Sequence, residues 1–138
     1  MPTPDAGPNV SGPSTARFIG LISGTSADGI DAALLTVSKE APDATPRIAV
    51  AHARTTPYPS ALRATILRVS QVDARLDLDE FGALDTAIGE AFAQAADALM
   101  ADAGLSPADV RAIGSHGQTL RHRPRPPHRF TLQVGDPN

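Results

Sequence analysis

The chain has 138 residues and a formal net charge of −3, a size that fits one domain. Its 41% hydrophobic and 20% charged residues are typical of a globular protein and exclude a coiled coil or a wholly disordered chain. No apolar run approaches the roughly 20 residues that cross a bilayer, the negative charge gives no general attraction to nucleic acid, and the absence of cysteine excludes disulfides and thiolate chemistry.

Residues 1–16 are predicted to form a disordered leader, and residues 17–138 the folded domain. The leader consists almost entirely of Pro, Gly, Ser, Thr, Ala and Asn, which cannot bury enough apolar surface to offset the entropy of ordering. It also lacks the basic start and apolar stretch of a secretory signal. We therefore expect a cytoplasmic protein that binds neither membrane nor nucleic acid.

Three strands are predicted to open the domain. Residues 18–22 and 30–37 are apolar runs separated by a turn of small and hydroxyl residues, and residues 47–55 alternate in polarity. Short connections between consecutive strands favour an antiparallel arrangement.

Two helices follow. Ser60 is expected to cap the first, whose apolar residues recur at spacings of four and three, and the second is predicted over residues 78–103 and ends before Gly104. Residues 110–113 and 130–134 are predicted strands, with a loop over 114–129 between them. The order predicts an α/β domain whose later strands pair in parallel through the helical crossover.

The turn after the first strand is the first candidate site. Glycines allow close approach of the backbone to an anion, hydroxyl and N–H groups can donate to phosphate, and Asp28 and Asp31 could hold a hydrated magnesium ion. The turn matches neither the Walker loop nor the dinucleotide fingerprint. The alternative is a hairpin turn in which Gly and Asp only satisfy the backbone geometry, although such a turn requires neither its hydroxyl residues nor Asp31.

The segment Gly114-Ser-His-Gly-Gln-Thr119 is the second candidate site. It follows a predicted strand, and ligands of α/β sheets bind at the carboxyl ends of strands. His116 and Gln118 flank a glycine and offer donors and acceptors for a hydroxyl-rich or amide-bearing ligand. The alternative is that His116 bonds a backbone group in an ordinary polar loop.

Residues 121–129 form a basic run interrupted by three prolines. No aromatic residue lies between the basic positions and the prolines exclude a groove-reading helix, so a solvated surface loop is favoured. The alternative function is a non-catalytic module that binds an anionic polymer through this loop.

Two stretches carry a resemblance to a known family. Arg17-Phe-Ile-Gly-Leu-Ile-Ser-Gly-Thr-Ser-Ala-Asp-Gly-Ile-Asp31 resembles the opening of the anhydro-N-acetylmuramic acid kinases. Ala112-Ile-Gly-Ser-His-Gly-Gln-Thr-Leu-Arg-His122, followed by Thr131-Leu-Gln-Val-Gly-Asp-Pro-Asn138, is similar to the second signature of that family. The resemblance covers nearly all of residues 17–138. One departure is Ala27, where the family usually has leucine, and we expect it to weaken local packing.

The resemblance implies a partial actin-like (ribonuclease H-like) ATPase domain of the sugar kinase/Hsp70/actin superfamily. Such kinases use ATP and Mg²⁺ to phosphorylate 1,6-anhydro-N-acetylmuramic acid, with hydrolytic opening of the anhydro ring, in peptidoglycan recycling. It also implies a small amino sugar as binding partner and a homodimer at full length. By resemblance, the ATP site comprises Gly24, Thr25, Ser26, Ala27, Asp28, Gly29, Ile30 and Asp31, with Asp28 and Asp31 on the metal, and the sugar site comprises Ser115, His116, Gln118 and Thr119.

The general-base aspartate of this family belongs to a motif that the resemblance places downstream of Asn138. No aspartate of this chain is assigned to that role. The second domain and the adenine pocket are likewise expected outside residues 17–138, so we expect this fragment alone to be inactive.

Overall fold

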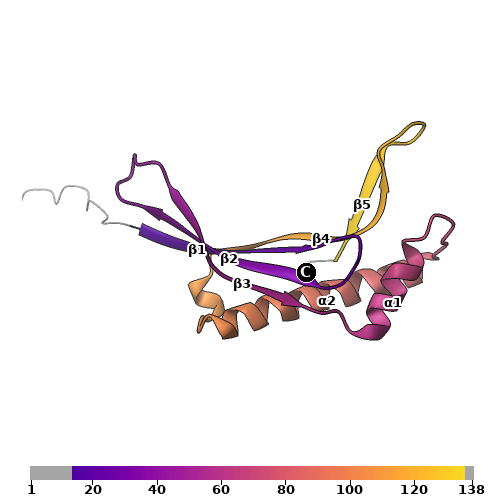
Figure 1. The fold of residues 1–138 in the computed structure, drawn as a ribbon, viewed down its shortest axis with the longest axis horizontal. Helices are drawn as coiled ribbons and strands as arrows, with labels where there is room; N and C mark the ends of the chain where they lie inside the picture. Colours follow the sequence, from indigo (N-terminus) through magenta and orange to yellow (C-terminus); the bar gives the residue numbers. More distant parts are fainter. Residues whose placement is uncertain (1–13, 136–138) are drawn as a thin grey trace, which may run out of the picture.

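The computed structural model describes residues 14–135 of the chain. They form a mixed five-stranded sheet with two helices on one face, which confirms the α/β class (Figure 1). The strands are β1 (Ser14–Ser23), β2 (Ile30–Lys39), β3 (Arg47–Thr56), β4 (Ala112–Arg123) and β5 (Phe130–Val134). The two helices are α1 (Ser60–Val69) and α2 (Leu78–Asp102), and a short 3-10 turn, η1 (Pro107–Asp109), precedes β4.

The strand order across the sheet is β3-β2-β1-β4-β5. The first three strands pair antiparallel, as predicted, and β4 pairs in parallel with β1 after the helical crossover. β5 pairs antiparallel with β4, because a short connection leads directly from one strand to the next. The later strands therefore include one parallel pair and one hairpin. The hairpin projects away from the rest of the sheet (Figure 1).

Helix α2 forms the core with one face of the sheet. Its buried face, repeating at helical spacing, packs on Ile19, Ile30 and Leu34 of the first two strands. The Asp77 carboxylate accepts a hydrogen bond from the Glu80 N–H and the Glu80 carboxylate accepts one from the Asp77 N–H, a reciprocal cap at the helix start. The described part of the chain contains no helix that is both long and apolar enough to cross a membrane.

Several predicted boundaries were wrong. β1 begins at Ser14, so residues 14–16 of the predicted leader belong to the sheet, while residues 1–13 lie outside the described residues. Ser60 does not cap α1. It is the first helical residue, and Pro59 occupies the N-cap position without a side-chain hydrogen bond.

The loop predicted over residues 114–129 was wrong over residues 114–123, because β4 continues to Arg123, whereas residues 124–129 do form the connection to β5. Ser115 pairs with Leu21 but Gln118 pairs with Ser23, so β4 contains one extra residue in this interval. Gly117 has a φ of 71° within this bulge. Because side chains alternate between the two faces of a strand, the extra residue turns Gln118 toward the helix-covered face. Without the bulge, Gln118 would lie on the open face.

Candidate functional site

The loop between β1 and β2 forms a closed turn. The Ser23 hydroxyl donates a 2.8 Å hydrogen bond to the carbonyl of Gly29 and thereby ties the two ends of the loop together. Inside the loop, the Ala27 N–H donates to the carbonyl of Gly24 at 3.1 Å. Ala27 is fully buried and has a φ of 50°, which is uncommon for a residue other than glycine. Such a conformation persists only where the surrounding contacts hold it.

Arg63 of α1 makes some of the contacts that hold Ala27 in this conformation. Its Nε donates to the carbonyl of Ala27 at 3.0 Å, and one terminal nitrogen contacts the carbonyl of Ser26 at 3.4 Å. The same nitrogen forms a 2.7 Å ion pair with the carboxylate of Asp28. Sequence reasoning missed Arg63, because nothing in the local sequence distinguishes it from Arg68 on the same helix.

The two aspartates of this turn have different surroundings. The side chain of Asp28 is 73% exposed, and hydrogen bonds from the side chains of Ser26 and Arg63 lower its pKa. The carboxylate of Asp31 accepts a hydrogen bond from the Thr55 hydroxyl of β3. Within residues 14–135, no three His, Asp or Glu side chains are grouped as a metal site. A magnesium ion bound mainly by phosphates and water needs only one or two carboxylates, which Asp31 and Asp28 could supply.

Gln118 connects the second motif to this loop. Its side chain is fully buried, at 0% exposure, and its Nε2 donates to the carbonyl of Gly24 at 3.0 Å. Its Oε1 accepts a 3.1 Å hydrogen bond from the hydroxyl of Tyr58, which is itself 6% exposed. Gln118 was predicted to face the sugar, but in this structure its amide is occupied inside the protein. The bulge at Gly117 is the physical reason, because it turns this side chain inward.

The other residues of the second motif lie nearer the surface. Ser115 and His116 are exposed and, with Asp85 of α2 and Gln133 of β5, line a cavity of about 340 Å³. Thr119 is partly buried, and its hydroxyl accepts a 3.0 Å hydrogen bond from Gln133 instead of lining this cavity. The four residues predicted to face the sugar therefore fall into two pairs. Ser115 and His116 lie at an accessible surface, whereas Gln118 and Thr119 are hydrogen-bonded within the protein.

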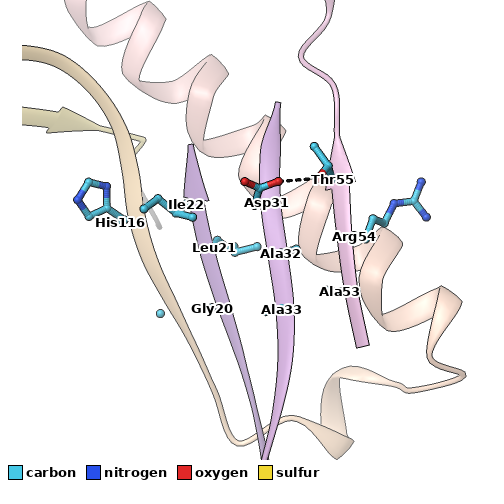
Figure 2. Close-up of a pocket in the computed structure, with 11 residues that line it drawn as sticks. Gly20, Leu21, Ile22, Asp31, Ala32, Ala33, Ala53, Arg54, Thr55 and His116 are labelled. Carbon is cyan, nitrogen blue, oxygen red and sulfur yellow. Dashed lines mark hydrogen bonds between the residues drawn. The ribbon is translucent and has the colours of Figure 1, made fainter. Parts of the chain in front are cut away.

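A second hollow of about 640 Å³ lies over the open face of the sheet. Its floor consists of small residues, including Gly20, Ala33 and Ala53 of the first three strands. Figure 2 shows Asp31 hydrogen-bonded to Thr55 over β2 and β3, with His116 across β1 from them. Residues from both predicted motifs therefore meet at one hollow.

The basic run forms the end of β4 and the turn that leads to β5. Arg121 is tied to the body of the domain, since its guanidinium donates to the carbonyls of Gln71 at 2.8 Å and Val69 at 3.3 Å, just beyond and at the end of α1. Residues 124–129 of the turn are exposed. Arg121 thus has a structural role, since it holds β4 to the end of α1. The hypothesis of polyanion binding then concerns the other basic residues of the run.

Comparisons with known proteins agree on one family. Residues 16–138 match the family described as anhydro-N-acetylmuramic acid kinase. The chain is 46% identical over 119 residues to the protein of that name from Xylella fastidiosa, covering 86% of this chain and 30% of the relative. Kinases of the same name from Xanthomonas axonopodis pv. citri and Shewanella loihica are 44% and 41% identical, over 86% and 88% of this chain and 31% of each relative. The chain therefore spans about a third of the length of the curated relatives that it matches.

Proposed function

We propose that this chain supplies the phosphate-binding and sugar-facing surface of an ATP-dependent amino sugar kinase. The proposal rests on the fact that the chain belongs to the anhydro-N-acetylmuramic acid kinase family. One observation carries the proposal. The loop at residues 24–29 and the bulged segment 115–119 are far apart in the sequence, yet the hydrogen bond from Gln118 to Gly24 joins them directly. A kinase needs its nucleotide phosphates and its acceptor in such proximity.

In this proposal, the loop at residues 24–29 binds the phosphates of ATP. Short turns that present several N–H groups are anion-binding concavities, and hydroxyl side chains such as that of Thr25 add donors. Asp31 is the favoured carboxylate for the accompanying magnesium ion, because the charge of Asp28 is already balanced by Arg63. Bound there, the ion would neutralise charge on the phosphates during transfer.

Ser115 and His116 are proposed to face the amino sugar. Both are exposed, and the cavity that they line also contains the carboxylate of Asp85 and the amide of Gln133. Hydroxyl, imidazole, carboxylate and amide groups together can bond a ring that carries hydroxyl and acetamido groups. Gln118 and Thr119 would support this surface from behind without touching the sugar.

The proposed reaction transfers the γ-phosphoryl group of ATP to O6 of 1,6-anhydro-N-acetylmuramic acid while water adds at the anomeric carbon and the anhydro bridge opens. The water must lose a proton to a general base. We assign that base, and the second domain of an actin-like kinase that would close over the substrates, to the part of the relatives that this chain does not span.

A chimeric kinase tests the proposal. Residues 16–138 would replace the matched segment of the Xylella fastidiosa kinase, and ADP release and phosphorylated product would be measured with the anhydro sugar, ATP and Mg²⁺. We expect turnover that depends on all three, with N-acetylmuramic acid 6-phosphate as product. A well-folded chimera without such turnover would contradict the proposal. The 138-residue chain assayed alone should be inactive, since removal of a general base alone costs about 10²–10⁴ in rate.

A further inference from the structure

Two side chains from different elements bind the loop at residues 24–29 through its carbonyl oxygens. Gln118 of β4 donates to the carbonyl of Gly24, at 3.0 Å. Arg63 of α1 donates to the carbonyl of Ala27 at 3.0 Å and contacts that of Ser26 at 3.4 Å. Both contacts use acceptors of the loop, so neither uses a group that could donate to an anion.

Because the peptide bond is planar, these contacts also fix the directions of two N–H groups of the loop. In a planar trans peptide the C=O and N–H bonds point in opposite directions. Holding the Gly24 carbonyl toward Gln118 therefore directs the N–H of Thr25 away from the protein interior. Holding the Ala27 carbonyl on Arg63 likewise directs the N–H of Asp28 away from α1. Two amide donors are thus set by side chains that lie on the opposite side of the loop.

We propose that Arg63 and Gln118 are positioning residues for the nucleotide, which aim the N–H groups of Thr25 and Asp28 at the phosphates of ATP. The inference rests on the proposed function of this loop. Neither side chain touches the nucleotide itself. The cationic group of Arg63 is bonded to two carbonyls and to the carboxylate of Asp28, and the amide of Gln118 is fully buried.

Two further contacts show how the positioning groups are themselves held. The hydroxyl of Tyr58 donates to Oε1 of Gln118, which fixes the orientation of the amide so that its NH₂ group faces Gly24. The carboxylate of Asp28 forms a 2.7 Å ion pair with the guanidinium of Arg63 and so anchors it. The loop is therefore held by two hydrogen-bonded pairs, Tyr58 with Gln118 and Arg63 with Asp28.

Matched methionine variants of the chimeric kinase separate positioning from general packing. Arg63→Met removes the guanidinium from α1, and its control Arg68→Met removes an exposed guanidinium from the same helix. Gln118→Met removes the amide at nearly constant volume, and its control Gln133→Met removes a partly buried amide from the adjacent strand. Each variant would be assayed for KM of MgATP, KM of the sugar, kcat and the melting temperature.

We expect Arg63→Met and Gln118→Met to raise the KM of MgATP about tenfold or more, since each loses a hydrogen-bonding group that orders the phosphate donors. Arg68→Met should leave the KM of MgATP unchanged, and Gln133→Met should change only the KM of the sugar. A residue with a merely structural role would lower the melting temperature and the active fraction without changing the KM of MgATP. That pattern at Arg63 and Gln118 would overturn the proposal.

If either methionine variant fails to fold, Tyr58→Phe and Arg63→Lys replace it, because each loosens the same pair without emptying the site. Both should raise the KM of MgATP by a smaller factor, and an unchanged KM in these folded variants would again overturn the proposal. Hydrogen exchange of residues 24–29 distinguishes this failure from that of the proposed function. If MgATP protects these amides but the variants retain its KM, only the positioning role is wrong. If MgATP leaves them unprotected in the unsubstituted chimera, the phosphate loop itself is wrong.

Discussion

Three glycine-to-alanine substitutions separate the contributions of backbone conformation and close packing to the stability of the bulge beside the proposed site. At Gly82, within α2, an added Cβ meets nothing within 4 Å and φ is helical. At Gly104, just after α2, φ is 65° and the space is again open. At Gly117, in the bulge of β4, φ is 71° and the Cβ would lie 2.5 Å from the carbonyl oxygen of Val134.

The expected effects differ in sign and size. Gly82→Ala should raise the free energy of unfolding by about 0.5–1 kcal/mol, because alanine is the better helix former. Gly104→Ala should lower it by about 1–2 kcal/mol, the cost of a left-handed alanine. Gly117→Ala carries the same conformational cost and must also displace the backbone of β5, for which overpacking adds about 1–3 kcal/mol. We therefore expect a loss of about 2–5 kcal/mol at Gly117.

Urea unfolding of the 138-residue chain, followed by far-ultraviolet circular dichroism, measures all three differences under one set of conditions. The informative comparison is Gly117→Ala against Gly104→Ala, since the two share the backbone penalty and differ in the contact with Val134. Equal losses at the two positions would refute the close approach of β4 and β5 at the bulge. A loss at Gly82 would refute the assignment of open space on the exposed face of α2.

Three further predictions concern single groups. Burial raises the pKa of Tyr58 above its ordinary value of 10.0. Since the chain has one tyrosine, phenolate absorbance should show ionisation with a midpoint above pH 10.0 in the folded chain and at pH 10.0 in urea. The associated stability is present below pH 10 and is lost as the pH rises through the raised pKa, so a folded-state pKa at or below 10.0 would be contradictory. Replacing Arg123 and Arg125 by serine should leave kinase activity of the chimera intact, whereas heparin or DNA affinity that falls steeply with salt and vanishes in this variant would favour the polyanion-binding alternative. Asp31→Asn should raise the Mg²⁺ concentration for half-maximal turnover by about tenfold or more. Asp28→Asn should raise it by a smaller factor, because the new amide oxygen still accepts a hydrogen bond from Arg63. A larger effect at Asp28 than at Asp31 would show that Asp28 is the main ligand.

The elements predicted correctly are those in which local pattern and tertiary surroundings agree. The first three strands are short apolar or alternating runs bounded by turn residues, and α2 carries a long amphipathic repeat between Asp77 and Gly104. β4 was missed over most of its length because Gly114 and Gly117 interrupt the apolar pattern on which strand prediction depends. Such glycines in a strand are the usual mark of a bulge. The sequence thus contained a signal for the bulge but none for its register.

The site could be predicted only as two separate motifs. The contact of Gln118 with Gly24 spans 94 positions of the sequence. It also depends on the extra residue at the bulge, which changes the face of the sheet on which Gln118 lies, so no local pattern reveals that face. Arg63 presents the same problem, since its role follows from where α1 packs against the turn. Residue types that suit a ligand were identified from the sequence, but the proposed assignment of each residue to the ligand or to the support of the loop required the fold.

The bulge of β4 links these observations into one physical account of the site. A regular strand would place Ser115 and Gly117 on the helix-covered face and Gln118 with His116 on the open face. One inserted residue instead leaves His116 at the surface and turns Gln118 inward, toward the loop at residues 24–29. A single irregularity therefore lets neighbouring residues face two different parts of the site, one accessible and one buried. The left-handed glycine that permits this bulge is also the position at which the largest loss of stability is expected on adding one methyl group.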